Sequence, residues 1–133
     1  MLVVLDDARD GASNLAIDEA LLEAEGSWLR FYAWTPATIS LGYFQRFEDF
    51  ADVEGRYPIV RRCTGGGAIL HARELTFSIA GPEALLPTAL GEHIPAALSL
   101  EPEVLGALPP AIQERADALR ASRYSTDAWQ RRR

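Results

Sequence analysis

The chain has 133 residues, 48% of them hydrophobic, so its length and composition predict a single globular domain with an ordinary apolar core. A formal net charge of -6 argues against a nucleic-acid surface, and the short apolar start at residues 1–5 is neither a signal peptide nor a membrane span. The single cysteine, Cys63, excludes an internal disulfide and fits a reducing, cytoplasmic compartment.

The chain begins with a predicted strand and helix. Residues 2–5 are Val and Leu, which favour a short strand. Ser13 or Asn14 has the side chain of a helix N-cap, and Gly26 is a typical stop. Between them, apolar residues recur at helical spacing and predict one buried face: Ile17, Ala20, Leu21 and Ala24.

The next part of the chain predicts mostly strands. Aromatic alternation at 28–34 and the apolar run at 38–41 are typical of strands, while the acidic stretch at 47–54 favours a short helix. A further strand is expected at 58–62, and the segment 68–80, after a glycine turn, resembles the two arms of a hairpin.

The last part returns to helical spacing, with a helix expected from about residue 111 to 122. Strands followed by helices without regular βαβ alternation predict the α+β class.

Two arginines and three glycines form the strongest chemical signal. Arg61 and Arg62 leave a predicted strand and run into Thr64 and the glycines at 65–67. Glycine lacks a Cβ, so backbone N–H groups can converge on an anion, and arginine offers a planar fork for a carboxylate or phosphate. His71 follows closely enough to face the same concavity. The set suits an acyl carboxylate, acyl phosphate or thioester, and it is neither a Walker A loop nor a Rossmann fingerprint.

This segment resembles the lipoate–protein ligase A and bacterial octanoyltransferase family, whose signature is Arg-Arg-x-Ser/Thr-Gly-Gly-Gly-Ala-x-x-His-Asp. The resemblance covers residues 1–80 nearly continuously, and it departs at Ala72, where the family usually has Asp. Outside the signature it rests on Asn14-Leu15-Ala16-Ile17-Asp18-Glu19, Leu29-Arg30-Phe31-Tyr32-Ala33-Trp34, Ile39-Ser40-Leu41-Gly42-Tyr43-Phe44-Gln45 and Glu74-Leu75-Thr76-Phe77-Ser78. It implies that the substrate-binding residues are Arg62, Thr64, Gly65, Gly66, Gly67 and His71, with Arg61 structural.

The C-terminal segment from Tyr124 to Trp129 resembles the Tyr-Ser-x-x-x-Trp ending of many members, yet the chain is much shorter than a full member. We therefore interpret residues 1–133 as one shortened catalytic domain. Residues 1–80 are its N-terminal core with the glycine loop, 81–110 the loop region that holds an internal deletion, and 111–133 a C-terminal helix and tail.

The resemblance also shows what is missing. The family's catalytic lysine belongs to the absent middle stretch, and all 13 basic residues of this chain are arginine. Thiol-dependent octanoyltransferases carry their nucleophilic cysteine beyond the glycine loop, whereas Cys63 lies inside the motif. No residue is predicted as catalytic, and no metal ligand is predicted.

The implied fold is that of the biotin/lipoate ligases, which is class II synthetase-like: a mixed, mostly antiparallel sheet with packed helices. The implied activity attaches a lipoyl or octanoyl group to a lysine of a lipoyl-domain or glycine-cleavage H protein. A ligase would use lipoate, ATP and Mg²⁺, whereas a transferase would take octanoyl from acyl carrier protein without such cofactors. No nucleic-acid or membrane partner is expected.

Two alternatives stay open. One alternative is that the chain is a catalytically inactive remnant, or an acyl-binding subunit whose catalytic residues come from a partner, because it lacks lysine. Biotin transfer is a weaker alternative, since the motif of two arginines and three glycines fits lipoate enzymes better.

Four features also have simple structural interpretations. Asp18 and Glu19 lie off the apolar stripe and are expected on a solvated helix face. Cys63 is expected to be an inert buried thiol, and the arginines at 131–133 a solvated tail.

Overall fold

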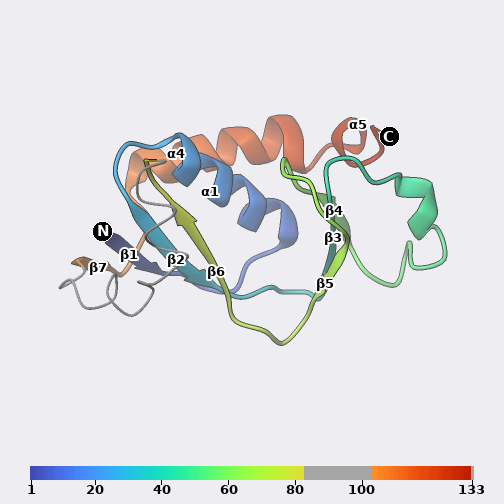
Figure 1. Cartoon of the computed structure of the whole chain (residues 1–133), viewed down its shortest axis with the longest axis horizontal. Coiled ribbons are helices and arrows are strands. Elements are labelled where there is room, and N and C mark those ends of the chain that lie inside the picture. The colour runs from blue at the N-terminus through green and yellow to red at the C-terminus, as the bar shows by residue number, and fades with distance from the viewer. Residues whose placement is uncertain (83–102, 133) are drawn as a thin grey trace.

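A computed structural model describes residues 1–82 and 103–132 (Figure 1). The strands are β1 (Leu2–Leu5), β2 (Trp28–Tyr32), β3 (Thr38–Leu41), β4 (Ile59–Arg61), β5 (Ile69–His71), β6 (Thr76–Ala80) and β7 (Glu103–Leu105). The helices are α1 (Gly11–Glu23), α4 (Pro110–Leu119) and α5 (Asp127–Gln130), with a 3₁₀ turn η1 (Phe47–Phe50) and a π-helical turn η3 (Arg120–Tyr124).

The strands form two sheets, one with the order β6-β2-β1-β7 and one with the order β4-β3-β5 (Figure 1). The α+β class with a mixed sheet is confirmed. The expectation of mostly antiparallel pairing is wrong for the described strands, because three pairs are parallel and two antiparallel. One of the parallel pairs arises at the start of the chain, where α1 connects the neighbours β1 and β2 as a βαβ crossover.

The predicted hairpin is also wrong. β5 pairs with β3 in the smaller sheet, whereas β6 pairs with β2 in the larger one. The loop between β5 and β6 therefore joins the two sheets (Figure 1). Apolar alternation identified both strands but carried no information about their partners.

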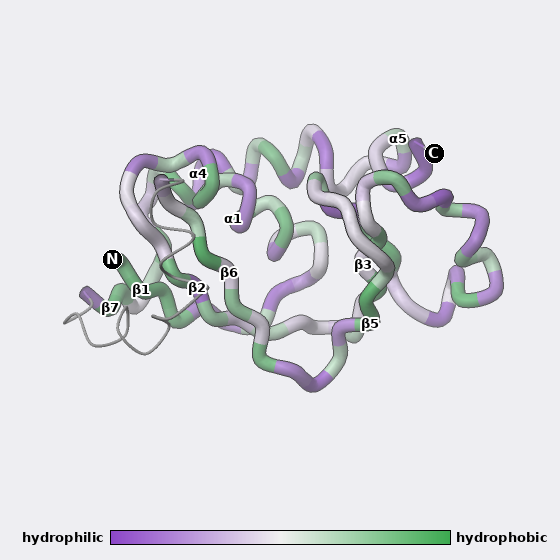
Figure 2. The backbone as a smooth tube through the Cα atoms, in the orientation of Figure 1, coloured by the Kyte–Doolittle hydropathy of each residue, from purple (hydrophilic) through white to green (hydrophobic). Residues whose placement is uncertain are grey.

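The N-cap of helix α1 is Asp10, three residues before the predicted Ser13, and its Oδ1 accepts a hydrogen bond from the Ser13 N–H at 3.0 Å. The predicted apolar face is buried at Ile17, Ala20 and Leu21, whereas Ala24 is the C-cap and only partly buried. This face packs with α4 and the larger sheet in one core, which includes Ile17, Leu21, Trp28, Ile112 and Tyr124. In Figure 2 the green, hydrophobic stretches of β1, β2 and β6 lie on the side of the molecule where α1 and α4 pack.

Arg30 lies in the middle of this packing with no exposed surface. Its guanidinium donates to Asp6 at 2.8 Å, to Asp18 at 2.8 Å and to the Asn14 side chain at 2.8 Å. Asp18 also accepts from Tyr32 Oη at 2.6 Å and Ser78 Oγ at 2.8 Å. Asp18 is therefore not on a solvated face: it joins α1 to β2 and β6.

We predict that Arg30→Ala lowers the free energy of unfolding by about 3–5 kcal/mol, the usual cost of leaving buried charges without their partner. Urea denaturation of the variant and the wild type measures this difference. Arg46→Ala is the control, since Arg46 is exposed and forms only a 3.9 Å pair with Glu48. Equal midpoints for Arg30→Ala and Arg46→Ala would contradict the prediction.

Candidate acyl-binding site

A cavity of about 290 Å³ lies between α1, β6 and the loop after β4. Most of the exposed lining surface is apolar, although charged and hydroxyl-bearing side chains also contribute to it. The lining residues are Leu15, Asp18, Glu19, Leu22, Arg62, Cys63, Thr64, Ser78, Ile79, Ala80 and Tyr124. Apolar walls with a small number of polar groups are typical of sites for small organic ligands.

Arg62 holds the glycine loop at the edge of this cavity. Its Nη1 donates to the Ser40 carbonyl at 2.9 Å and to Ser40 Oγ at 2.7 Å. Its Nη2 donates to the carbonyls of Gly65 at 3.1 Å and Gly67 at 2.8 Å. Burial lowers the pKa of Arg62 from its ordinary value, but a guanidinium stays charged at neutral pH. The residue thus places a fixed positive charge beside the cavity and orients the loop.

Arg61 has the structural role expected for it. It is fully buried, and its Nη1 donates to the carbonyls of Gly42, Tyr43 and Gln45. Its Nε and Nη2 donate to the Gln130 carbonyl at 3.1 and 2.9 Å. Arg61 therefore ties the C-terminal helix α5 to the end of β3.

The backbone of the glycine loop packs directly against Gly42, the residue that follows β3. A Cβ placed on Gly42 would lie 1.9 Å from the Gly66 carbonyl oxygen, so only glycine fits there. Gly66 itself has a φ of 96°, which glycine adopts without strain. By contrast, a Cβ on Gly67 would meet nothing within 4 Å. One side of the loop packs on β3 and the other stays accessible to a ligand.

His71 lies behind the loop. Its ring stacks on Trp34 at 3.8 Å between centroids, and Nδ1 lies 2.7 Å from Glu74 Oε1. A carboxylate only accepts, so Nδ1 carries the proton, and in neutral His71 Nε2 accepts from Ser40 Oγ at 2.8 Å. Burial lowers the pKa of His71 and so favours the neutral ring, whereas the hydrogen bond and charge of Glu74 oppose that shift. Glu74 also accepts from the Ala72 N–H at 2.7 Å.

The structure therefore places only some of the six predicted site residues at the cavity. Arg62 and Thr64 line the cavity, and the three exposed glycines lie beside it. His71 is 8% exposed and reaches the loop through Ser40 and Arg62. Its position indicates that it fixes Ser40 and the loop, and contact of any of the six with substrate stays a prediction.

Sequence reasoning missed two acidic residues and a tyrosine at the cavity. Asp18 and Glu19 were expected to be solvated, but both line it. Glu19 accepts from Arg123 through Oε1 and from Tyr124 Oη through Oε2. Nothing in the helix periodicity reveals these partners, because they come from a segment about a hundred residues later.

Cys63 was expected to be buried, and this is wrong: the thiol is exposed and lines the cavity edge. The residue sits in the loop after β4, where the chain has already left the core.

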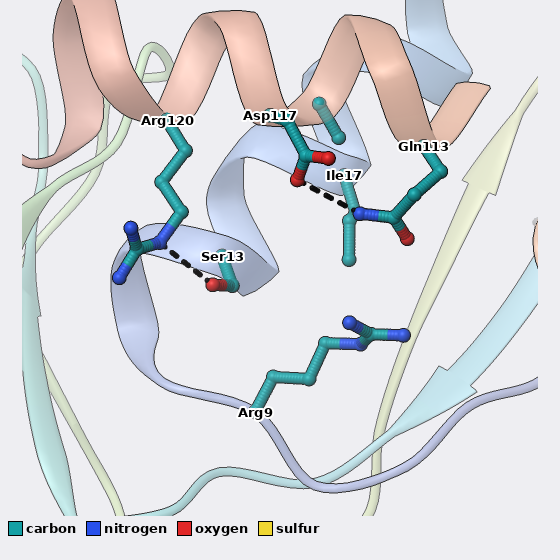
Figure 3. A pocket seen from close by; sticks show the side chains of 7 residues that line it. Arg9, Ser13, Ile17, Gln113, Asp117 and Arg120 are labelled. Carbon is teal, nitrogen blue, oxygen red and sulfur yellow. Dashed lines mark hydrogen bonds between the residues drawn. The ribbon is translucent and has the colours of Figure 1, made fainter. Parts of the chain in front are cut away.

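A second hollow, between α1 and α4, is much smaller, at about 40 Å³ (Figure 3). Several of its polar side chains already have hydrogen-bond partners. Arg120 donates to Ser13 Oγ at 2.9 Å and Gln113 to Asp117 at 2.9 Å, while Arg9 is held by Asp6 at 2.9 Å. This hollow is therefore interpreted as a small gap between two packed helices.

Within residues 1–82 and 103–132, no group of three His, Cys, Asp or Glu side chains is arranged to hold a metal ion. None of the helices in those ranges is long and apolar enough to cross a membrane.

Comparisons with known proteins identify the family. Residues 10–94 match the lipoyl protein ligase A/B catalytic domain, so the chain belongs to that family. The octanoyltransferase LipM of Macrococcus caseolyticus is 47% identical over 79 residues, covering 53% of this chain and 29% of that protein. LipM of Moorella thermoacetica is 49% identical over 83 residues, covering 56% and 30%. The matched region is thus about a third of the length of these curated relatives.

Solved structures agree on the fold. Protein Ta0514 of T. acidophilum superimposes with a TM-score of 0.74 at 16% identity, covering 99% of each chain. A lipoate-protein ligase A bound with ATP matches with a TM-score of 0.50 at 31% identity, covering 59% of this chain and 35% of that one. The biotin/lipoate ligase-like fold is therefore confirmed.

We predict that Gly42→Ala displaces the glycine loop and destabilises the protein by about 1–3 kcal/mol, the usual cost of overpacking. Thermal denaturation measures the change. Gly67→Ala is the matched control, because its Cβ meets open space, and it should denature like the wild type. A stable Gly42→Ala variant would show that β3 and the loop are less closely packed than described.

Proposed function

We propose that this chain binds an octanoyl or lipoyl group in the cavity between α1 and β6 and presents it to an acceptor lysine. The observation that carries the proposal is the cavity itself, with apolar walls and the Arg62–glycine loop at its edge. About 290 Å³ is close to the lower end of the range for ligand sites, roughly 300–1,000 Å³. Such a volume suits a single medium-length acyl chain.

The orientation of the acyl group follows from charge. Leu15, Leu22 and Ile79 offer apolar contacts for the chain, whereas Arg62 supplies the positive charge that a carboxylate or thioester oxygen would approach. The free side of Gly67 lets an acyl oxygen come close to the backbone. The acyl carbonyl would therefore lie at the loop.

The octanoyltransferase branch is the better supported of the two chemistries. Relatives named octanoyltransferase are 44–51% identical to this chain over their matched regions, compared with 31% for the ATP-bound ligase structure. ATP and Mg²⁺ belong to the proposal only for the ligase branch, and no step is assigned to them.

The acceptor would be a lipoyl domain or a glycine-cleavage H protein, with acyl carrier protein as the octanoyl donor and the cytoplasm as the compartment. The family match and the names of the octanoyltransferase relatives support this assignment to lipoyl-group metabolism.

We expect Arg62→Ala to weaken octanoate binding by about 1.5–3 kcal/mol, the usual worth of a charged hydrogen bond. The physical reason is loss of both the charge and the anchor of the loop. Isothermal titration calorimetry with octanoate and with lipoate measures it.

Arg56→Ala is the control for this experiment, because Arg56 is an exposed arginine outside the cavity lining. Equal octanoate affinity for wild type and Arg62→Ala would argue against the site. If the wild-type protein does not bind octanoate, the acyl-binding proposal is refuted.

The absence of lysine favours a second candidate, an acyl-binding subunit that does not complete the transfer. Acyl transfer builds negative charge on an oxygen, and a preorganised donor or cation there typically lowers the barrier by about 3–4 kcal/mol. Arg62 already uses both Nη atoms to hold the loop and Ser40.

We therefore predict that the chain alone modifies an acceptor very slowly or not at all. Purified protein is mixed with an apo lipoyl domain, with octanoyl-acyl carrier protein in one tube and lipoate, ATP and Mg²⁺ in another, and the acceptor mass is followed. A full-length family enzyme is the positive control. A comparable rate of mass gain would show that Arg62 or another group replaces the lysine.

A further inference from the structure

A continuous chain of hydrogen bonds runs from Glu74 to the arginine at the edge of the acyl cavity. Glu74 Oε1 accepts from His71 Nδ1 at 2.7 Å, and His71 Nε2 lies 2.8 Å from Ser40 Oγ. Ser40 Oγ in turn accepts from Arg62 Nη1 at 2.7 Å. Three separate parts of the fold meet here, since Ser40 lies on β3, Arg62 follows β4 and His71 ends β5. Of these four residues, Arg62 alone lines the cavity.

The hydrogens in this chain can be arranged in only one way while Glu74 is ionised. The carboxylate only accepts: its Oε1 takes the proton of His71 Nδ1, and its Oε2 takes that of the Ala72 N–H at 2.7 Å. In neutral His71, Nε2 is then an acceptor, so the single hydroxyl hydrogen of Ser40 points to it. This leaves a lone pair of Ser40 Oγ for the Arg62 guanidinium, which can only donate. Every bond therefore has the same donor direction, from Arg62 to Glu74.

The two side chains in the middle of the chain are closely packed. Ser40 has no exposed surface, and the His71 ring lies flat on Trp34, with 3.8 Å between the ring centroids and 9° between the planes. Burial lowers the pKa of His71, and the charge of Arg62 acts in the same direction, whereas Glu74 opposes the shift. Because these side chains have almost no access to water, a change in the hydrogen bond at one end must be taken up at the other.

At the cavity end, the chain fixes how the Arg62 guanidinium lies. Its two Nη atoms donate four hydrogen bonds, two to the carbonyl and Oγ of Ser40 and two to the carbonyls of Gly65 and Gly67. The guanidinium is planar, so these four bonds also set the direction of its Nε–H. Within residues 1–82 and 103–132 this N–H has no hydrogen-bond partner. It is therefore the donor of Arg62 that remains for a ligand oxygen.

We propose that Glu74, acting through His71 and Ser40, positions the Arg62 guanidinium for the oxygen of the acyl group. This inference rests on the proposed function, because it takes the acyl oxygen to approach Arg62. Glu74, His71 and Ser40 are positioning residues, which act through Arg62 and touch no reacting atom. The family resemblance implies that His71 binds the substrate, and in this arrangement it contributes to binding without contact.

The substitution Glu74→Gln tests the chain, because it reverses the donor direction with almost no change in shape. A glutamine amide has one accepting oxygen and one donating NH2 group in place of two acceptors. The Ala72 N–H requires the oxygen, so the NH2 group faces His71 Nδ1. His71 must then carry its proton on Nε2 and donate to Ser40 Oγ. That oxygen would face two donors, from His71 and Arg62, and its own hydrogen would lose its acceptor.

The first measurement is ¹⁵N NMR of the histidine rings at about pH 7.5, above the ordinary pKa of histidine. We expect the His71 proton on Nδ1 in the wild type and on Nε2 in Glu74→Gln. The chain has two histidines, so the His71 signals are assigned by comparison with His93→Gln. A wild type with the His71 proton on Nε2 overturns the proposal, and this result does not depend on whether Glu74→Gln folds.

The second measurement is isothermal titration calorimetry with octanoate. We expect Glu74→Gln to weaken binding roughly tenfold, the low end of what a hydrogen bond to a charged group contributes. Ser40→Ala removes the middle of the chain and should cause a similar loss. The double variant should bind no more weakly than either single variant, because both changes break the same chain. Glu48→Gln is the matched control, since it removes the same charge from η1, outside the cavity lining, and it should bind like the wild type.

Three calorimetric results would overturn the proposal: equal affinity of Glu74→Gln and the wild type, additive losses in the double variant, or an equal loss in Glu48→Gln. The last would mean that only net charge matters. A wild type that binds no octanoate refutes the acyl site and this inference with it. By contrast, unchanged octanoate binding by a Glu74→Gln protein whose His71 proton has moved to Nε2 refutes the positioning chain alone.

Discussion

The buried ion-pair network of Arg30 is the constraint on which the rest of the structure depends. Burying a guanidinium is costly unless nearly every donor has a partner, and Asp6, Asn14 and Asp18 supply those partners from β1's end and α1. Asp18 in turn accepts from Tyr32 on β2 and Ser78 on β6. The network thereby fixes the spacing between α1 and β6, which are the two walls of the cavity.

Arginine serves three different purposes in this chain, and each depends on its planar fork. Arg30 satisfies buried carboxylates, Arg61 gathers backbone carbonyls from the end of β3 and from α5, and Arg62 holds the glycine loop. Lysine, with a compact ammonium group, could not contact so many acceptors at once. Outside these three purposes, Arg131 and Arg132 were expected in a solvated tail, but their guanidinium groups lie over the rings of Phe47, Tyr43 and Trp129.

Much of the fold could be predicted because local signals were strong. The strand at 38–41 was placed correctly, and most of the apolar stripe of α1 is buried. The family signature also located the loop that borders the cavity. Strand partners could not be predicted, since β5 and β6 are close in sequence but join different sheets, and this depends on contacts with β3 and β2 that no local pattern encodes. The positions of Glu19 and Cys63 at the cavity were missed for the same reason. Glu19 binds residues of η3, and Cys63 lies in a loop whose path the local sequence does not reveal.

The π-helical turn η3 has a consequence for the length of the C-terminal segment. In an α-helix successive side chains point about 100° apart, so two neighbours rarely reach one carboxylate. The wider turn, which is in effect an α-helix with an inserted residue, lets both Arg123 and Tyr124 reach Glu19. Removing one residue from this turn would restore a regular helix and rotate everything after it. The positions at 120–124 should therefore tolerate changes of side chain better than changes of length, a pattern opposite to that of ordinary surface connections.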